Sequence, residues 1–179
     1  MKWILPFALM AGPVFAETCP AASDHSAQLA DIVASLQISR GAGEARVLTD
    51  QLWALWTDAP DTRAQALLDT GMRQREAFNL MASRNTLDEL VAYCPDYAEG
   101  YNQRAFSKYL QQDFAAALVD LDRAIALVPN HIAAISGRGL TLMGLGRHDE
   151  AQEALRAALA LNPWLAERSL ITEPIGTDI

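Results

Sequence analysis

The sequence predicts an all-α protein: a right-handed α-solenoid of helix–turn–helix hairpins, with an N-terminal helical hairpin and a C-terminal capping helix. Pro95, Pro129 and Pro163 follow one another at 34-residue intervals, which indicates a repeat. Between these prolines, apolar residues return every three or four positions, the spacing of one helix face. Small residues that would let two helices approach closely recur at the same interval; the pairs are Ala105/Gly139, Ala117/Ala151 and Ala124/Ala158.

Two units, residues 98–131 and 132–165, each predict two helices joined by a short turn. Pro129 and Pro163 fall where the second helix must end, because proline lacks the N–H that continuation needs. A degenerate copy of the unit, residues 64–97, precedes them. Such a copy is expected physically, since an isolated pair of hairpins leaves apolar faces uncovered.

The chain outside the repeats also predicts helix. Within the N-terminal segment, residues 17–63, apolar stripes over Ser26–Leu36 and Glu44–Trp56 indicate a helical hairpin that caps the stack. After the last repeat, residues 164–171 predict a capping helix and residues 172–179 a short tail.

Within each unit, large apolar residues, small residues and a proline occupy fixed positions, and this pattern is more specific than the 34-residue interval. These residues are Tyr101, Ala105, Ala117, Leu121, Ala124 and Pro129, then Ile135, Gly139, Ala151, Leu155, Ala158 and Pro163. In this pattern the unit resembles the tetratricopeptide repeat. Arg104 and Arg138 depart from it, since the family has leucine there, and Lys108 stands where an aromatic residue is usual. The mature stretch also resembles small exported proteins of this family from alphaproteobacteria.

The first residues resemble an export signal. Lys2 supplies a positive charge, a short apolar run follows, and Val14 and Ala16 suit a cleavage site. We therefore expect residues 1–16 to be a cleaved signal peptide, the protein to be periplasmic, and the mature chain not to insert into a membrane. The alternatives are an apolar N-terminus of a cytosolic protein and a lipoprotein, the latter disfavoured by Glu17 and Thr18 before the cysteine.

Cys19 and Cys94 are the two cysteines of the chain, and an oxidising compartment favours their pairing. We expect a structural disulfide between them. Two free thiols and a redox-active pair are the alternatives, although a C-x-x-C spacing is missing.

The composition excludes several classes of function. The chain has 179 residues, with 14 basic and 22 acidic side chains and a formal charge of −8, which disfavours nucleic-acid binding. No catalytic or phosphate-binding motif occurs, and the three histidines show no metal-ligand spacing. We expect no enzyme activity, no metal and no cofactor. The rival is a small-ligand binder or enzyme accessory subunit that uses Asp120, Asp122, His148 and the arginines.

Arg104 and Arg138 are charged at a position that is usually apolar. We expect ion pairs within each hairpin, from Arg104 to Asp120 or Asp122 and from Arg138 to Glu153. Alternatively, the two guanidinium groups of these arginines bind a carboxylate group of a ligand.

The resemblance implies a concave groove lined by the first helix of each unit. Carried over position by position, the groove residues are Glu99, Asn102, Phe106, Tyr109, Leu110, Ala133, Ser136, Leu140 and Met143. The lysines with which part of the family grips a terminal carboxylate are missing: those positions hold Asn102, Phe106, Gln103, Ala133 and Gly137. We therefore expect a partly apolar groove, with Glu99 and Asn102 orienting an extended segment or an amphipathic helix. Alternatively, Phe106, Leu140 and Met143 simply pack against neighbouring helices.

These expectations favour a monomeric, non-catalytic module that binds a protein or peptide through its concave face. The rival from another class is a structural scaffold or self-associating component of a cell-envelope complex.

Overall fold

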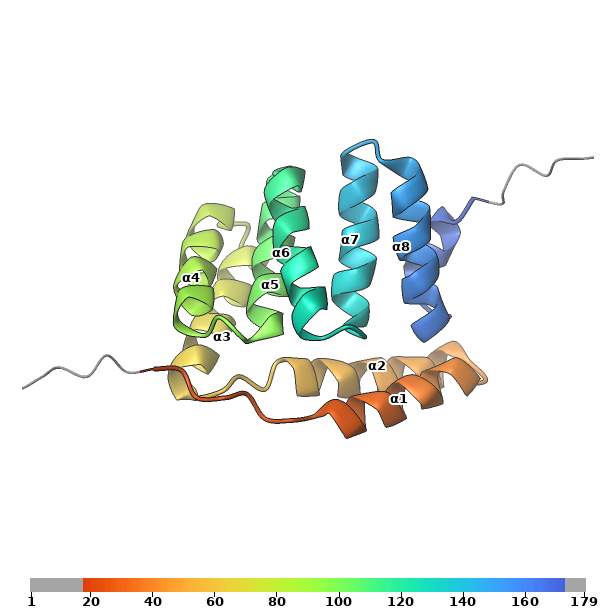
Figure 1. The fold of residues 1–179 in the computed structure, drawn as a ribbon, viewed down its shortest axis with the longest axis horizontal. Helices are drawn as coiled ribbons and strands as arrows, with labels where there is room; N and C mark the ends of the chain where they lie inside the picture. The colour runs from red at the N-terminus through yellow and green to blue at the C-terminus, as the bar shows by residue number, and fades with distance from the viewer. Residues whose placement is uncertain (1–17, 173–179) are drawn as a thin grey trace, which may run out of the picture.

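The computed structural model describes residues 18–172, and these residues form eight α-helices and one short 3-10 helix with no strand among them (Figure 1). The elements are α1 Ser26–Ile38, α2 Ala42–Trp56, α3 Thr62–Glu76, α4 Leu80–Tyr93, α5 Ala98–Leu110, α6 Phe114–Leu127, α7 Ile132–Gly144, α8 His148–Leu161 and η1 Ala166–Leu170. None of the helices in this described part is long and apolar enough to cross a membrane. The predicted signal peptide and nearly all of the predicted tail lie outside the described residues.

Helices α3 to α8 stack side by side as three consecutive hairpins, and the predicted α-solenoid is confirmed (Figure 1). The hairpins α3–α4, α5–α6 and α7–α8 coincide with the three predicted units to within two residues at their starts. Asp61, Asn79 and Asp113 each accept a hydrogen bond from the backbone N–H three residues on. These caps fix where α3, α4 and α6 begin, because the first N–H groups of a helix have no partner within it.

Small residues allow the two helices of each hairpin to lie close together. Ala105 is 1% exposed, and Ala117, Ala124, Ala151 and Ala158 are fully buried. At two glycines the space is too small even for a methyl group. A Cβ at Gly139 would lie 2.6 Å from Cδ2 of Leu155, and one at Gly71 would lie 2.6 Å from Cγ of Leu87. At these two positions even a methyl group would require the facing leucine side chain to shift.

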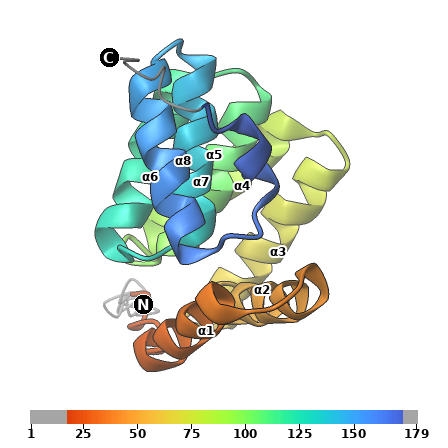
Figure 2. The ribbon, with the colours of Figure 1, turned by 90° about the vertical axis from the view of Figure 1, so that its right-hand side faces the viewer.

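The predicted N-terminal helical hairpin forms as α1 and α2, but it does not continue the stack of repeats. Helices α1 and α2 run across one end of the other helices (Figures 1 and 2). Leu36, Leu52 and Trp56 of this hairpin share one apolar cluster with Ile132 at the start of α7 and with Leu161 at the end of α8. The side chain of Gln37 donates to the carbonyl oxygen of Ala160 at 2.9 Å. The apolar faces of α1 and α2 are therefore buried against the last repeat, far away in sequence.

Cys19 and Cys94 form a disulfide, the pairing that the sequence predicts, with their Cα atoms 5.2 Å apart. The bond ties the segment before α1 to the residue that follows α4. At the other terminus, the predicted capping helix is shorter than expected: only η1, a 3-10 helix, forms. Gln152 of α8 holds this segment by donating to the carbonyl oxygen of Leu170 at 2.9 Å and accepting from the N–H of Thr172 at 2.9 Å.

Candidate functional site

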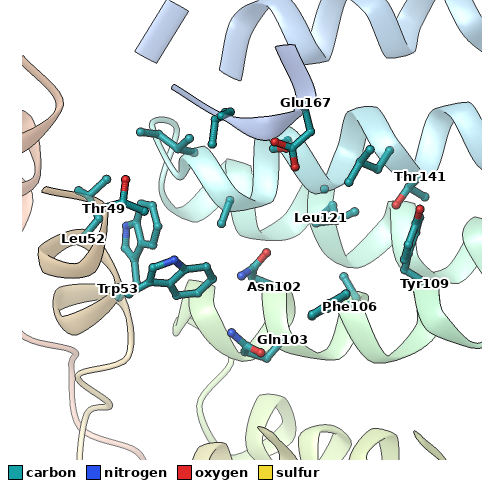
Figure 3. Close-up of a pocket in the computed structure, with 18 of the residues that line it drawn as sticks. Thr49, Leu52, Trp53, Asn102, Gln103, Phe106, Tyr109, Leu121, Thr141 and Glu167 are labelled. Carbon is teal, nitrogen blue, oxygen red and sulfur yellow. The ribbon is translucent and has the colours of Figure 1, made fainter. Parts of the chain in front are cut away.

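A cavity of about 430 Å³ opens on the side of the stack lined by α5 and α7 (Figure 3). Its walls are mainly apolar and include Phe106 and Tyr109 from α5 and Leu140 from α7. Trp53 and Trp56 of α2 also line it, and Figure 3 shows Trp53 at one end. The N-terminal hairpin thus contributes to the wall of the cavity.

Six of the predicted groove residues line this cavity: Asn102, Phe106, Tyr109, Ala133, Ser136 and Leu140. Phe106 is 47% exposed, whereas Asn102 is only 7% exposed and lies deeper. Figure 3 shows Trp53 at one end of the cavity and Tyr109 and Thr141 at the other. Phe106 and Leu140 are therefore available to a ligand, not merely packed against neighbouring helices.

Three predicted groove residues lie elsewhere. Glu99 is only 1% exposed and does not line the cavity, because polar neighbours enclose its carboxylate. Met143 packs against a cluster that contains Leu142 and Ala151. Leu110, the last residue of α5, is partly exposed and lies outside the cavity lining.

Elements outside α5 and α7, which the sequence pattern does not indicate, also contribute to the cavity. Thr49, Leu52, Trp53 and Trp56 of α2 line it, as do Met72 and Arg75 of α3 and Leu165 and Glu167 near the C-terminus. The apolar stripe of α2 is visible in the sequence, but it predicts only that one face of the helix is buried. Its direction across the repeats depends on contacts between distant segments, which periodicity does not encode.

A buried polar network lies beside the cavity and centres on Glu99. Its carboxylate accepts hydrogen bonds from Nδ2 of Asn102 at 3.1 Å, from Nε2 of His131 at 2.8 Å and from the side-chain amide of Gln103. The side-chain oxygen Oε1 of Gln103 in turn accepts from the guanidinium of Arg75. The network therefore joins α3 and α5 to the start of α7.

Aromatic rings complete this arrangement. Nδ1 of His131 accepts from the first turn of α7 at 3.3 Å, so the ring proton sits on Nε2 and is donated to the carboxylate. Trp56 stacks on His131 with centroids 4.3 Å apart, and its carbonyl oxygen accepts from the hydroxyl of Tyr97 at 2.8 Å. The guanidinium of Arg75 lies 4.5 Å from the centre of the Phe106 ring. Burial lowers the pKa of Arg75 and raises the pKa of Tyr97.

The arginines join neighbouring hairpins. Nε and a terminal nitrogen of Arg104 donate to Asp120 at 2.8 and 2.6 Å, and its other terminal nitrogen donates to Asp88 of the preceding hairpin at 2.8 Å. Arg138 pairs with Asp122 at 2.8 Å, so the expected partner Glu153 is wrong. One repeat after Asp120 the chain carries alanine, so α8 offers Arg138 no counterpart of the Asp120 carboxylate that Arg104 contacts.

The residues of the rival catalytic hypothesis do not converge. Asp120 is 2% exposed and is also bound by Lys108 at 2.7 Å, while Asp122 and His148 are exposed. Over residues 18–172, no group of three or more His, Cys, Asp or Glu side chains is placed to hold a metal ion. Neither Arg104 nor Arg138 lines the cavity, where the alternative hypothesis would need both.

Comparison with known proteins agrees with the geometry. Residues 109–164 match the model of the tetratricopeptide repeat family. The chain contains tetratricopeptide repeats. The match covers α6, α7 and α8, and the earlier helices α3, α4 and α5 continue the same helix–turn–helix arrangement.

Two relatives extend the similarity. A TPR repeat-containing protein of Rhizobium etli is 24% identical over 150 residues, which is 84% of this chain and 74% of that protein. Tetratricopeptide repeat protein 36 of Xenopus tropicalis is 33% identical over 115 residues, 61% of this chain and 56% of the frog protein. The chain thus spans little more than half of the frog relative.

Among solved structures, the first TPR domain of Spaghetti (RPAP3), bound to an HSP90 peptide, superimposes with a TM-score of 0.59 at 22% identity. The superposition covers 60% of this chain and 86% of that domain. At this identity the likeness shows the fold alone.

Proposed function

We propose that this protein is a non-catalytic interaction module of the periplasm that binds a peptide segment of another protein in the groove between α5 and α7. The observation that carries the proposal is the apolar cavity on that side, with Phe106 47% exposed at it. An exposed aromatic side chain beside a concave apolar site is typical of a binding surface.

The likeness to a TPR domain that holds an HSP90 peptide supports a peptide as the type of ligand. The lysines of a carboxylate grip are missing from this chain. We therefore propose that apolar contacts supply most of the affinity, and that the peptide is recognised along its length and not by its terminal carboxylate.

The periplasmic location is supported by the signal-like residues 1–16 and by the disulfide between Cys19 and Cys94, which an oxidising compartment favours. N-terminal sequencing of the exported protein should begin at Glu17. A product that retains Met1 in the cytoplasm would contradict this part of the proposal.

The groove is tested by the double substitution Phe106→Ala with Tyr109→Ala. A photo-crosslinking residue placed at Leu110, beside the cavity, would first identify the partner in intact cells. Titration of peptides from that partner should then show a loss of affinity of at least about tenfold in the double variant, because two aromatic contacts disappear. Val119→Ala, which removes a 68% exposed side chain from α6, is the control. Equal affinity of the double variant, with unchanged helical content, would contradict the groove assignment.

A further inference from the structure

We infer that the cavity binds a small amphipathic monocarboxylate, such as an alkanoate, whose carboxylate group accepts hydrogen bonds from the guanidinium of Arg75 while its apolar chain lies against the cavity walls. The ligand is not a peptide, so the inference goes beyond the proposed function. Three observations carry it: a buried guanidinium that forms no ion pair, its place in the wall of the cavity, and the apolar surface around it.

Arg75 is a buried cation without an opposite charge bound to it. The residue is 9% exposed, and its guanidinium donates to the side-chain oxygen Oε1 of Gln103. Within residues 18–172 that is its one hydrogen bond, and no carboxylate forms an ion pair with it. A guanidinium has more N–H donors than one acceptor can use. Because buried charges in proteins are normally paired with an opposite charge, Arg75 is suited to bind an anion.

The repeat directs Arg75 toward the cavity. Arg75 stands one 34-residue interval before Tyr109, so the two residues occupy the same position on α3 and α5, and both line the cavity. The guanidinium lies 4.5 Å from the centre of the Phe106 ring, which is in the same lining. Gln103, which accepts from Arg75, also lines the cavity. The guanidinium is therefore held between two side chains that a ligand in the cavity would contact.

The charges around Arg75 favour an anion that carries a single charge. Burial lowers the pKa of Arg75 and outweighs the attraction of Glu99 and Glu76, so these carboxylates compensate its charge only in part. The amide of Gln103 separates Arg75 from Glu99, whose carboxylate already accepts from that amide and from His131. One further negative charge, such as that of a carboxylate, compensates the guanidinium, whereas a phosphate dianion would leave an excess of negative charge.

The walls of the cavity suit an apolar chain. Trp53 and Leu140 supply aromatic and aliphatic surface, and the volume of about 430 Å³ lies within the range for ligand pockets. Among the described residues of the lining, Arg75 is the one basic residue and Glu167 the one acidic residue. Figure 3 shows Glu167 on the side of the cavity opposite Gln103, the residue that Arg75 contacts. Repulsion by Glu167 therefore favours the orientation in which the ligand carboxylate lies at Arg75.

Calorimetric titration of the disulfide-bonded chain with octanoate, below the concentration at which it forms micelles, tests the inference. Octanol has the same chain without the charge, and octyltrimethylammonium carries the opposite charge. We expect octanoate to bind at least about tenfold more tightly than octanol, because it gains charge-assisted hydrogen bonds, and octyltrimethylammonium to bind more weakly than both. Equal affinities for octanoate and octanol would overturn the inference. Tighter binding of octyl phosphate than of octanoate would overturn the assignment to a monocarboxylate.

The substitution Arg75→Met separates recognition from structure, because it removes the charge and keeps a long side chain. We expect it to weaken octanoate binding at least about tenfold and to leave octanol binding unchanged, so that the difference between the acid and the alcohol disappears. Arg73→Met, at an exposed site of the same helix outside the lining, removes the same charge and should change neither affinity. Equal losses for octanoate and octanol in Arg75→Met would show that Arg75 only supports the cavity, which would overturn the inference.

A filling substitution locates the site and leaves Arg75 in place, so the test remains decisive if Arg75→Met does not fold. Ala133→Phe places a ring in the cavity lining and should abolish octanoate binding, whereas Ala157→Phe, at an exposed site of α8 outside the lining, should not. If octanoate binds Ala133→Phe as tightly as the unchanged protein, the ligand lies elsewhere and the inference fails. Capture of a partner by the crosslinker at Leu110 does not depend on octanoate, so the proposed function would stand.

Discussion

Glu99 holds together the elements that form the cavity, and its removal provides the sharpest test of the network. Its carboxylate is 1% exposed and accepts from Asn102, Gln103 and His131. These bonds link α5 to the start of α7 and, through Gln103, to Arg75 of α3. We predict that Glu99→Ala destabilises the whole solenoid and is not a local defect of the groove.

The expected magnitude follows from what the substitution leaves behind. Donors of Gln103 and His131 lose their acceptor in a dry interior, at about 1–3 kcal/mol for each buried unsatisfied group. Removing one partner from a buried charged cluster typically costs about 3–5 kcal/mol. We therefore expect a loss of about 3–5 kcal/mol, a large share of the about 5–15 kcal/mol that stabilises most proteins. Glu99→Gln keeps the volume but presents a donor to other donors, and should cost about 1–3 kcal/mol.

Urea unfolding followed by circular dichroism measures these losses, with the disulfide intact and linear extrapolation to zero urea. Glu153→Ala on the exposed face of α8 is the control and should stay within about 0.5 kcal/mol of the unchanged protein. A loss below about 1 kcal/mol for Glu99→Ala would refute the view that this network stabilises the fold.

Three further predictions concern the fold. Gly139→Ala should destabilise the protein by about 1–3 kcal/mol, because the added Cβ would lie 2.6 Å from the buried side chain of Leu155. Gly43→Ala is the control: a Cβ there meets open space, and the change should stabilise α2 by about 0.5 kcal/mol. Urea unfolding measures both free-energy changes. Replacing Cys19 and Cys94 by serine should cost about 2–4 kcal/mol in the same assay, and no change would show that the bond constrains little. Burial raises the pKa of Tyr97 above that of the unfolded chain, so its contribution to stability is complete below pH about 10 and declines above it. Above pH about 10, the free energy of unfolding of the unchanged protein should fall by about 1.4 kcal/mol per pH unit relative to that of Tyr97→Phe, as measured by urea unfolding. If the free energies of unfolding of the two proteins change with pH in parallel, the prediction is wrong.

The three stacked hairpins could be predicted from the sequence because their determinants are local and steric. Gly139 and Ala151 can be read as contact points since only small residues fit where helices cross, and their partners lie at a fixed interval. Pro129 ends α6 for a reason that belongs to proline itself. Such constraints depend on only a few neighbouring residues, so they can be recognised from the sequence alone.

The cavity could not be predicted in the same way, because it depends on contacts between distant segments. The family resemblance assigned Glu99 to the groove, but the residue is buried, and its carboxylate accepts a hydrogen bond from His131 at 2.8 Å. Likewise, the apolar stripe with Trp53 and Trp56 shows that α2 buries one face, without showing what lies against that face. A helical pattern identifies a buried side and leaves its partner open.

The elements outside the repeats hold one wall of the cavity in place. The disulfide of Cys19 anchors the chain before α1, and Gln37 at the other end of that helix is bonded to the carbonyl oxygen of Ala160, so the hairpin is tied at both ends. Exposure along α5 rises from 7% at Asn102 to 47% at Phe106, away from the tryptophans of α2 (Figure 3). The cavity is therefore more accessible at Phe106 than at Asn102. Because α2 supplies part of the cavity wall, the two contacts that fasten the hairpin help to hold the shape of the site.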